Sequence, residues 1–195
     1  MAPELHLTGD DDADALLSDS PLALVIGMLL DQQVPMETAF AGPSKLQKRL
    51  DGLDAKAIAD HEPEGLVDIF RTPPAVHRFP GSMAARVQTL ARTIVDDWGD
   101  DPAAIWTSGD PDAPEVLRRL KSLPGFGEQK AKIFLALLGK QYGVTPPGWR
   151  ETAAPYGEEG SYRSVADIVD AASLARVRES KKAAKAAAKA SASKG

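Results

Sequence analysis

A five-residue turn between two helical segments constrains the fold of this chain more than any other feature. The turn reads Leu-Pro-Gly-Phe-Gly at residues 123–127, and its two glycines let the backbone reverse sharply. The flanking segments, 114–121 and 128–142, place apolar residues at helical spacing. We therefore expect residues 114–142 to form a hairpin of two helices.

The turn of this hairpin has the chemistry of a phosphate-binding site. Its backbone N–H groups are exposed beside the N-terminus of the second helix, where the helix dipole favours an anion. Gly125 and Gly127 have no Cβ, so a nucleic-acid backbone can approach closely. Such a contact sets position along a strand without reading its bases. The alternative is a plain corner in which Phe126 fills the core.

The remainder of the chain also indicates helices. Ser20 and Pro21 begin an apolar helix that runs to about residue 33, a second helix spans 36–50, and an amphipathic helix runs from Ser82 to Gly99. Alternating patterns typical of strands are nearly absent. We expect an all-α fold, a helical bundle of two small subdomains.

The charge distribution divides the chain. Residues 176–195 contain seven basic residues and one acid, a net charge of +6, so the preceding 175 residues have a net charge of −11. We expect an acidic lead-in over residues 1–18 that frays or forms a short turn, a helical domain over 19–170, and a separable, basic Lys/Ala-rich tail helix over 171–195. The tail either follows phosphates or only aids solubility.

Composition also limits the cofactors and the compartment. The chain has no cysteine, which excludes disulfides, thiolate zinc sites and cysteine-held iron–sulfur clusters. Its three histidines show no metal-ligand spacing, so we expect neither a metal nor any other cofactor. The longest apolar stretch, 22–30, is too short to span a membrane, and we expect a cytoplasmic protein.

Three segments, in order, resemble the HhH-GPD superfamily of base-excision-repair DNA glycosylases, which includes endonuclease III and the 3-methyladenine glycosylases. Residues 121–131 are similar to the family's helix-hairpin-helix, residues 29–34 (Leu-Leu-Asp-Gln-Gln-Val) to its glutamine-containing corner, and residues 81–98 to the helix before the hairpin. The resemblance covers roughly residues 21–149. It implies a DNA-glycosylase fold and a nucleoid-associated monomer that binds double-stranded DNA and no membrane.

The resemblance also implies which residues contact DNA. In the family, the corner glutamine enters the gap left by a nucleotide that is rotated out of the duplex. The matching positions are Gln32 and Gln33, with Gln33 the better fit, although two glutamines can also simply cap a helix. The hairpin adds Leu123, Gly125, Gly127, Lys130 and Lys132.

The family's catalytic aspartate has no direct counterpart. It should follow the loop at residues 143–149, which contains no acid, and the first acid beyond that loop is Glu151. Glu151 is therefore the candidate catalytic carboxylate, with Asp31 as a weaker candidate beside the glutamine corner. A carboxylate there stabilises the cationic sugar or activates water.

Gln129 occupies the position at which bifunctional members of the family have their Schiff-base lysine. Lys130 is one residue further on, and the resulting rotation of about 100° is expected to turn it away from the pocket. The resemblance therefore implies a monofunctional, hydrolytic glycosylase. Trp149 and Tyr156 are candidates for stacking on the extruded base.

Three functions stay open on the sequence alone. The first is a glycosylase that releases a damaged base, and the second is a damaged-DNA-binding module that has lost catalysis along with the aspartate. The third is a helical interaction protein in which the hairpin is only a corner.

Overall fold

The structure, a computed structural model, describes residues 2–194 and is built from helices. That range contains eleven α-helices and one 3₁₀ helix and no strand, which confirms the expected all-α fold. The α-helices are α1 (Asp11–Asp19), α2 (Pro21–Leu30), α3 (Met36–Arg49), α4 (Ala55–Asp60), α5 (Pro63–Arg71), α6 (Pro80–Trp98), α7 (Ala104–Thr107), α8 (Ala113–Lys121), α9 (Glu128–Gln141), α10 (Trp149–Thr152) and α11 (Ala171–Ala192); the 3₁₀ helix η1 spans Val165–Asp167.

Helix α2 is the centre of the molecule. Ser20 caps it by accepting a hydrogen bond from the Ala23 N–H, Pro21 occupies its first turn, and every later residue to its end is buried. Its neighbour α3 lies very close, because a Cβ on Gly27 would be 2.6 Å from the Phe40 ring. A helix that is apolar all round is expected at the middle of a core, and the sequence of α2 fits that place.

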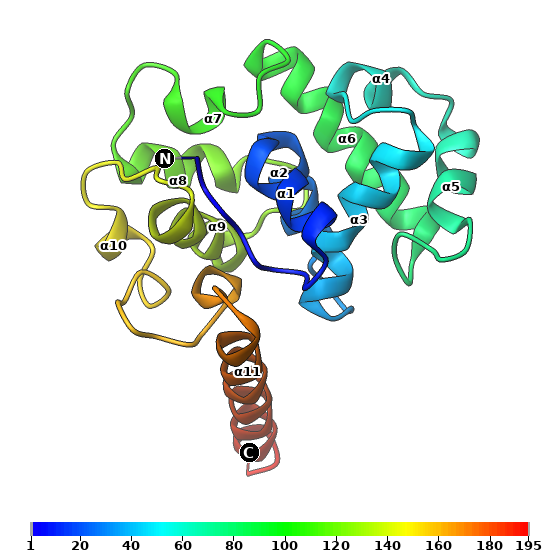
Figure 1. Ribbon diagram of the computed structural model, residues 1–195. Helices are drawn as coiled ribbons and strands as arrows, with labels where there is room; N and C mark the ends of the chain where they lie inside the picture. The colour runs from blue at the N-terminus through cyan, green and yellow to red at the C-terminus, as the bar shows by residue number, and fades with distance from the viewer. Residues whose placement is uncertain (1, 195) are drawn as a thin grey trace.

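Two groups of helices flank α2 (Figure 1). Helices α3 to α6 form one group, in which α4 and α5 pack along α6. Helices α8 to α10 form the other group together with η1, and α11 leaves the body beside it. The hairpin between α8 and α9 meets the C-terminal end of α2, where the glutamine corner begins: a Cβ on Gly125 would be 2.3 Å from Leu29, and Lys130 Nζ donates to the Leu29 carbonyl.

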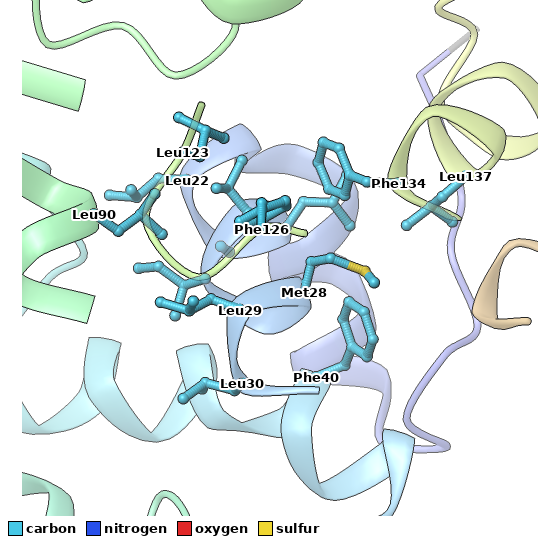
Figure 2. Packing of buried hydrophobic residues seen from close by; sticks show 14 of the residues in the cluster. Leu22, Met28, Leu29, Leu30, Phe40, Leu90, Leu123, Phe126, Phe134 and Leu137 are labelled. Atoms are coloured by element: carbon cyan, nitrogen blue, oxygen red, sulfur yellow. The ribbon is translucent and has the colours of Figure 1, made fainter. Parts of the chain in front are cut away.

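The hairpin turn is fastened to α2 by apolar side chains. Figure 2 shows Leu123 and Phe126 of the turn packed around Leu22 and Leu29 of α2. Leu123 is 3% and Phe126 is 5% exposed, and the Phe126 ring meets the edge of Phe134 with 6.0 Å between ring centroids. The position of the turn is thus fixed by the same core that fixes the glutamine corner.

The N-terminal segment differs from the expected frayed lead-in. Leu5 and Leu7 are buried, and α1 begins at Asp11. The buried Asp14 carboxylate accepts hydrogen bonds from the backbone N–H groups of Leu7 and Thr8, at 3.0 and 2.9 Å. The acidic composition gave no sign of this arrangement. Asp14 supplies hydrogen-bond acceptors to backbone N–H groups of an extended segment that has no helix or sheet partner for them.

Within residues 2–194 no single helix is long and apolar enough to cross a membrane. Helices α1 and α2 meet that criterion only as a pair, and they are bent by 115° relative to each other.

Candidate functional site

The hairpin turn presents backbone to solvent and side chains to the core. Gly125 has a left-handed conformation, with φ of +80°, and Gly127 forms the N-terminal boundary of α9 without a side-chain cap. Both glycines are exposed, whereas Leu123 and Phe126 are buried. The first-turn N–H groups of α9 are therefore available to an anion. Leu123, expected among the DNA contacts, can contribute only its backbone because its side chain lies in the core.

The two glycines of the turn have different surroundings. A Cβ on Gly125 would be 2.3 Å from Leu29 Cδ1, so this residue has to be glycine for the turn to pack on α2. A Cβ on Gly127 would have no heavy atom within 4 Å, and its φ of −80° suits any residue. The fold does not need a glycine at residue 127, and the space beside it is open to a ligand.

The corner after α2 separates the two candidate glutamines. Gln32 is tied into the protein: its Nε2 donates to the Leu29 carbonyl at 3.0 Å, and its Oε1 accepts from Arg86 Nη1 at 2.9 Å. Gln33 is exposed and has a left-handed backbone, with φ of 59°. The corner thus projects Gln33 outward while it holds Gln32 against the body.

Sequence reasoning missed the residue that braces this corner, His77. It is buried, and its Nδ1 accepts a hydrogen bond from the Phe79 N–H, so the ring proton is on Nε2. Nε2 lies 3.1 Å from the Leu30 carbonyl oxygen and 3.0 Å from that of Gln32, to which it donates. A single histidine forty-five residues after the corner gave no signal of this contact.

A cavity of about 540 Å³ lies between the glutamine corner, the first turn of α9, the loop that follows α10, and α11. Its main polar and charged lining residues are Asp31, Gln32, Gln33, Gln129, Lys130, Tyr156, Arg163 and Lys181. The structure therefore brings together both candidate glutamines, Lys130 and Tyr156. The Tyr156 hydroxyl accepts a hydrogen bond of 2.9 Å from Gln129 Nε2, which holds the ring at the wall.

Asp31 and Lys130 have opposite charges and share this cavity. Burial raises the pKa of the Asp31 carboxyl, and the nearby charges of Lys181 and Lys130 partly offset that rise. Burial likewise lowers the pKa of the Lys130 amine, with the charge of Asp31 acting in the opposite direction. Titratable groups shifted by burial inside a cavity are typical of functional sites.

The expectation that Lys130 turns away from the pocket is wrong. Its Nζ donates a hydrogen bond of 3.1 Å to the Leu29 carbonyl, and the residue lines the cavity. The rotation of one residue moves the Cβ around α9, but the long side chain reaches back to the last turn of α2. The carbonyl end of that helix attracts a cation.

Three other candidates lie outside this cavity. Glu151 is exposed on α10 and is not among the lining residues, so the structure does not bring the expected carboxylate to the glutamine corner. Trp149 packs instead on α9, where a Cβ on Gly139 would be 2.3 Å from its ring, and Arg150 lies 4.5 Å above it. The docking of α10 on α9 thus uses the tryptophan that we expected to stack on a base. Lys132 lies on α9 and pairs with Glu128 at 3.8 Å.

A second cavity, of about 580 Å³, lies beside η1 and the start of α11. Its most buried charged groups already satisfy each other: Lys140 Nζ is 2.5 Å from Asp167 Oδ1, and the Asp167 carboxylate also accepts from the backbone N–H of Arg163. This pair stabilises the loop before η1 and has no free group to offer a substrate. Over residues 2–194, no three His, Asp or Glu side chains gather as a metal site requires.

A comparison with protein-family models confirms the family that the sequence resembles. The model of the HhH-GPD superfamily, described as base excision DNA repair proteins, matches residues 26–194, which include the glutamine corner, the hairpin and α11. Comparison with curated proteins and with solved structures gives no match. The family match covers most of the chain, and the chain therefore belongs to the HhH-GPD superfamily of base excision DNA repair proteins.

Proposed function

We propose that the protein is a monofunctional DNA N-glycosylase whose active site is the cavity that contains Asp31. The observation behind this proposal is that one cavity joins the glutamine corner, the first turn of the hairpin helix and a half-buried carboxylate. Family membership makes DNA the partner and base excision repair the role.

In this proposal the hairpin holds the duplex and the corner opens it. The exposed amides at Gly127 and the first turn of α9 bind a phosphate, with the open space beside Gly127 giving the backbone room to approach. The exposed Gln33 enters the stack and hydrogen-bonds the base left without its partner. Rotation of the damaged nucleotide then brings its base into the cavity between Gln129, Tyr156 and Asp31, where the Tyr156 ring stacks on it.

Asp31 supplies the chemistry. The bond between the sugar C1′ and the base nitrogen breaks, the sugar becomes cationic, and the ionised carboxylate stabilises that charge. Asp31 then accepts a proton from the water that attacks C1′, and the departing base takes up a proton, so that water is divided between sugar and base. The charges of Lys181 and Lys130 favour the ionised form of Asp31 and partly offset the rise in its pKa that burial causes.

The charge of the cavity favours a neutral base. Three basic side chains face one carboxylate there, namely Lys130, Arg163 and Lys181 against Asp31. An N-alkylated purine is cationic and would be repelled by this excess of basic groups, whereas the carbonyl oxygens of a neutral base can accept hydrogen bonds from the cationic side chains of Arg163 and Lys181. We therefore infer that the substrate is a deaminated or oxidised base.

A panel of lesion duplexes tests this function. Duplexes that contain uracil, hypoxanthine, 8-oxoguanine, an oxidised pyrimidine or 3-methyladenine are incubated with the protein, and abasic sites are measured after alkali. We expect product from at least one neutral lesion and less from the alkylated one. A folded protein that releases none of these bases would contradict the proposal.

The same reactions separate hydrolysis from attack by an amine. Burial lowers the pKa of the Lys130 amine, which is the property that an amine nucleophile needs. The Lys130 hydrogen bond to the Leu29 carbonyl occupies this amine in the absence of DNA, and we expect borohydride to trap no covalent protein–DNA adduct. Trapping that disappears in Lys130→Met would replace the hydrolytic mechanism with a lyase mechanism.

One observation favours a second candidate, a damaged-DNA-binding module without catalysis. The loop at residues 143–149 lacks the aspartate that the family resemblance implies. This candidate predicts tight binding to a duplex with an abasic analogue together with no base release from any lesion.

A further inference from the structure

We propose that helix α11 is a second DNA-binding element, in which Lys181, Lys185 and Lys189 hold the phosphates of one duplex arm beside the cavity. This inference rests on the proposed function, because it says that the DNA strand which enters the cavity continues along α11. The chemistry of the partner is that of a continuous polyanion with regularly spaced charges.

The first turns of α11 are fixed to the body. Asp170 caps the helix by accepting a hydrogen bond of 2.7 Å from the Ser173 N–H, and Val177 is fully buried. Arg178 forms an ion pair with Glu37 of α3, whose side chain is only 15% exposed. Val177 packs in the core and Arg178 binds α3, and these two contacts set the direction in which α11 leaves the molecule. The first turns of α11 are therefore part of the body and do not form the separable tail that we expected.

The helix is continuous with the cavity. Ser180, Lys181 and Ala184 line its wall, and the charge of Lys181 acts on the Asp31 carboxyl. Beyond residue 184 every described residue of α11 is exposed, and the helix projects from the body (Figure 1). A nucleic-acid strand that leaves the cavity at this wall therefore meets the projecting part of α11 directly.

The spacing of the lysines suits a phosphate backbone. Lys181, Lys185 and Lys189 recur every four residues and so follow one face of the helix, about 6 Å apart along its axis. No acid follows Glu179, so nothing in the sequence of this segment neutralises the stripe. The body of the protein is acidic, which makes a local basic surface the attractive path for DNA.

If α11 only aids solubility, lysines on different faces of the helix should contribute equally to the behaviour of the protein. Lys182 is rotated about 100° from Lys181, and Lys194 lies after the end of α11 at Ala192. Both are exposed, and neither belongs to the stripe. They provide a control with the same change of charge.

Two double variants of the full chain test the proposal, Lys185→Ala/Lys189→Ala and Lys182→Ala/Lys194→Ala. Alanine keeps the helix stable, which circular dichroism verifies. Binding to a 25-base-pair duplex with a tetrahydrofuran abasic analogue is measured between 50 and 200 mM salt. We expect the slope of log K against log salt to become less steep by about 1.8 in the stripe variant, since each lost phosphate contact removes about 0.9. The control variant should keep the slope of the unchanged protein.

Equal slopes for the two double variants, in a protein that still binds the duplex and releases bases, would overturn this proposal alone. Failure of the unchanged protein to bind the duplex would overturn both this proposal and the proposed function. A shorter duplex gives a second measurement. Lys189 lies about 12 Å beyond Lys181 along the helix, or roughly four base pairs. Cutting one arm of the duplex to two base pairs, with the other arm kept long enough to hold the strands together, should for one of the two arms abolish the difference between the unchanged protein and the stripe variant.

Discussion

The two glycines of the hairpin turn should separate stability from DNA binding. In Gly125→Ala, the new Cβ would lie 2.3 Å from Leu29 Cδ1, and the residue would have to keep a φ of +80°. The left-handed backbone costs about 1–2 kcal/mol for a residue with a Cβ, and overpacking of a core costs roughly 1–3 kcal/mol. The free energy of unfolding should therefore fall by about 2–5 kcal/mol, which lowers Tm by roughly 4–20 °C for a chain of this size.

Gly127→Ala is the matched change two residues later. Its Cβ would meet no heavy atom within 4 Å, so Tm should stay close to that of the unchanged protein. The methyl group would occupy the space proposed for the DNA backbone, and the affinity for an abasic-analogue duplex should fall by about tenfold. Thermal melts and fluorescence anisotropy measure the two effects. The reasoning is refuted if Gly125→Ala melts normally, or if Gly127→Ala binds DNA like the unchanged protein.

Two further changes address the buried charges. Asp31→Asn should raise Tm at pH 7, because burial raises the folded-state pKa of the carboxyl and its ionised form therefore lowers stability above that pKa. The gain in Tm should vanish as the pH falls below the ordinary pKa of 3.8. A Tm that is unchanged or lower at pH 7 would contradict this prediction. Lys140→Met leaves Asp167, 4% exposed, without its cation and should cost about 3 kcal/mol, seen in urea unfolding. Lys56→Met, which breaks an exposed pair with Asp60, is the control and should leave the urea midpoint unchanged, whereas equal losses in both variants would argue against this account.

The sequence was sufficient to predict the hairpin and the central helix because both rest on local signals. The turn at residues 123–127 and the cap at Ser20 depend on neighbouring residues alone. Their packing on each other through Leu29 and Phe126 follows from their apolar character. The family's glutamine corner was also found, since it directly follows α2.

The composition of the cavity could not be predicted, because it depends on side chains that reach between distant segments. Lys130 contacts Leu29 across 101 residues, and the direction of so long a side chain is not set by its place on the helix. Glu151 was the expected carboxylate from its distance to the hairpin, but Trp149 turns α10 onto α9 and leaves Glu151 exposed. The acid that lines the cavity beside the glutamines is Asp31.

The N-terminal and C-terminal segments show the limits of charge as a guide. An acidic composition suggested a frayed start, yet Asp14 is buried and accepts hydrogen bonds from the backbone N–H groups of Leu7 and Thr8. A basic composition suggested a separable tail, yet Val177 and Arg178 attach α11 to the body. In both segments a few buried contacts determine the structure, and the average charge of the segment does not reveal them.

Single-turnover base release by Asp31→Asn tests the central claim most directly. The rate constant is measured on the best duplex of the lesion panel, beside the unchanged protein and Glu151→Gln, with all three proteins saturating the DNA. If Asp31 is the catalytic carboxylate, its loss should slow release by about 100-fold or more, while Glu151→Gln, which changes an exposed residue outside the cavity, should react at the rate of the unchanged protein. Release by Asp31→Asn at the unchanged rate, or its loss in Glu151→Gln, would contradict the account.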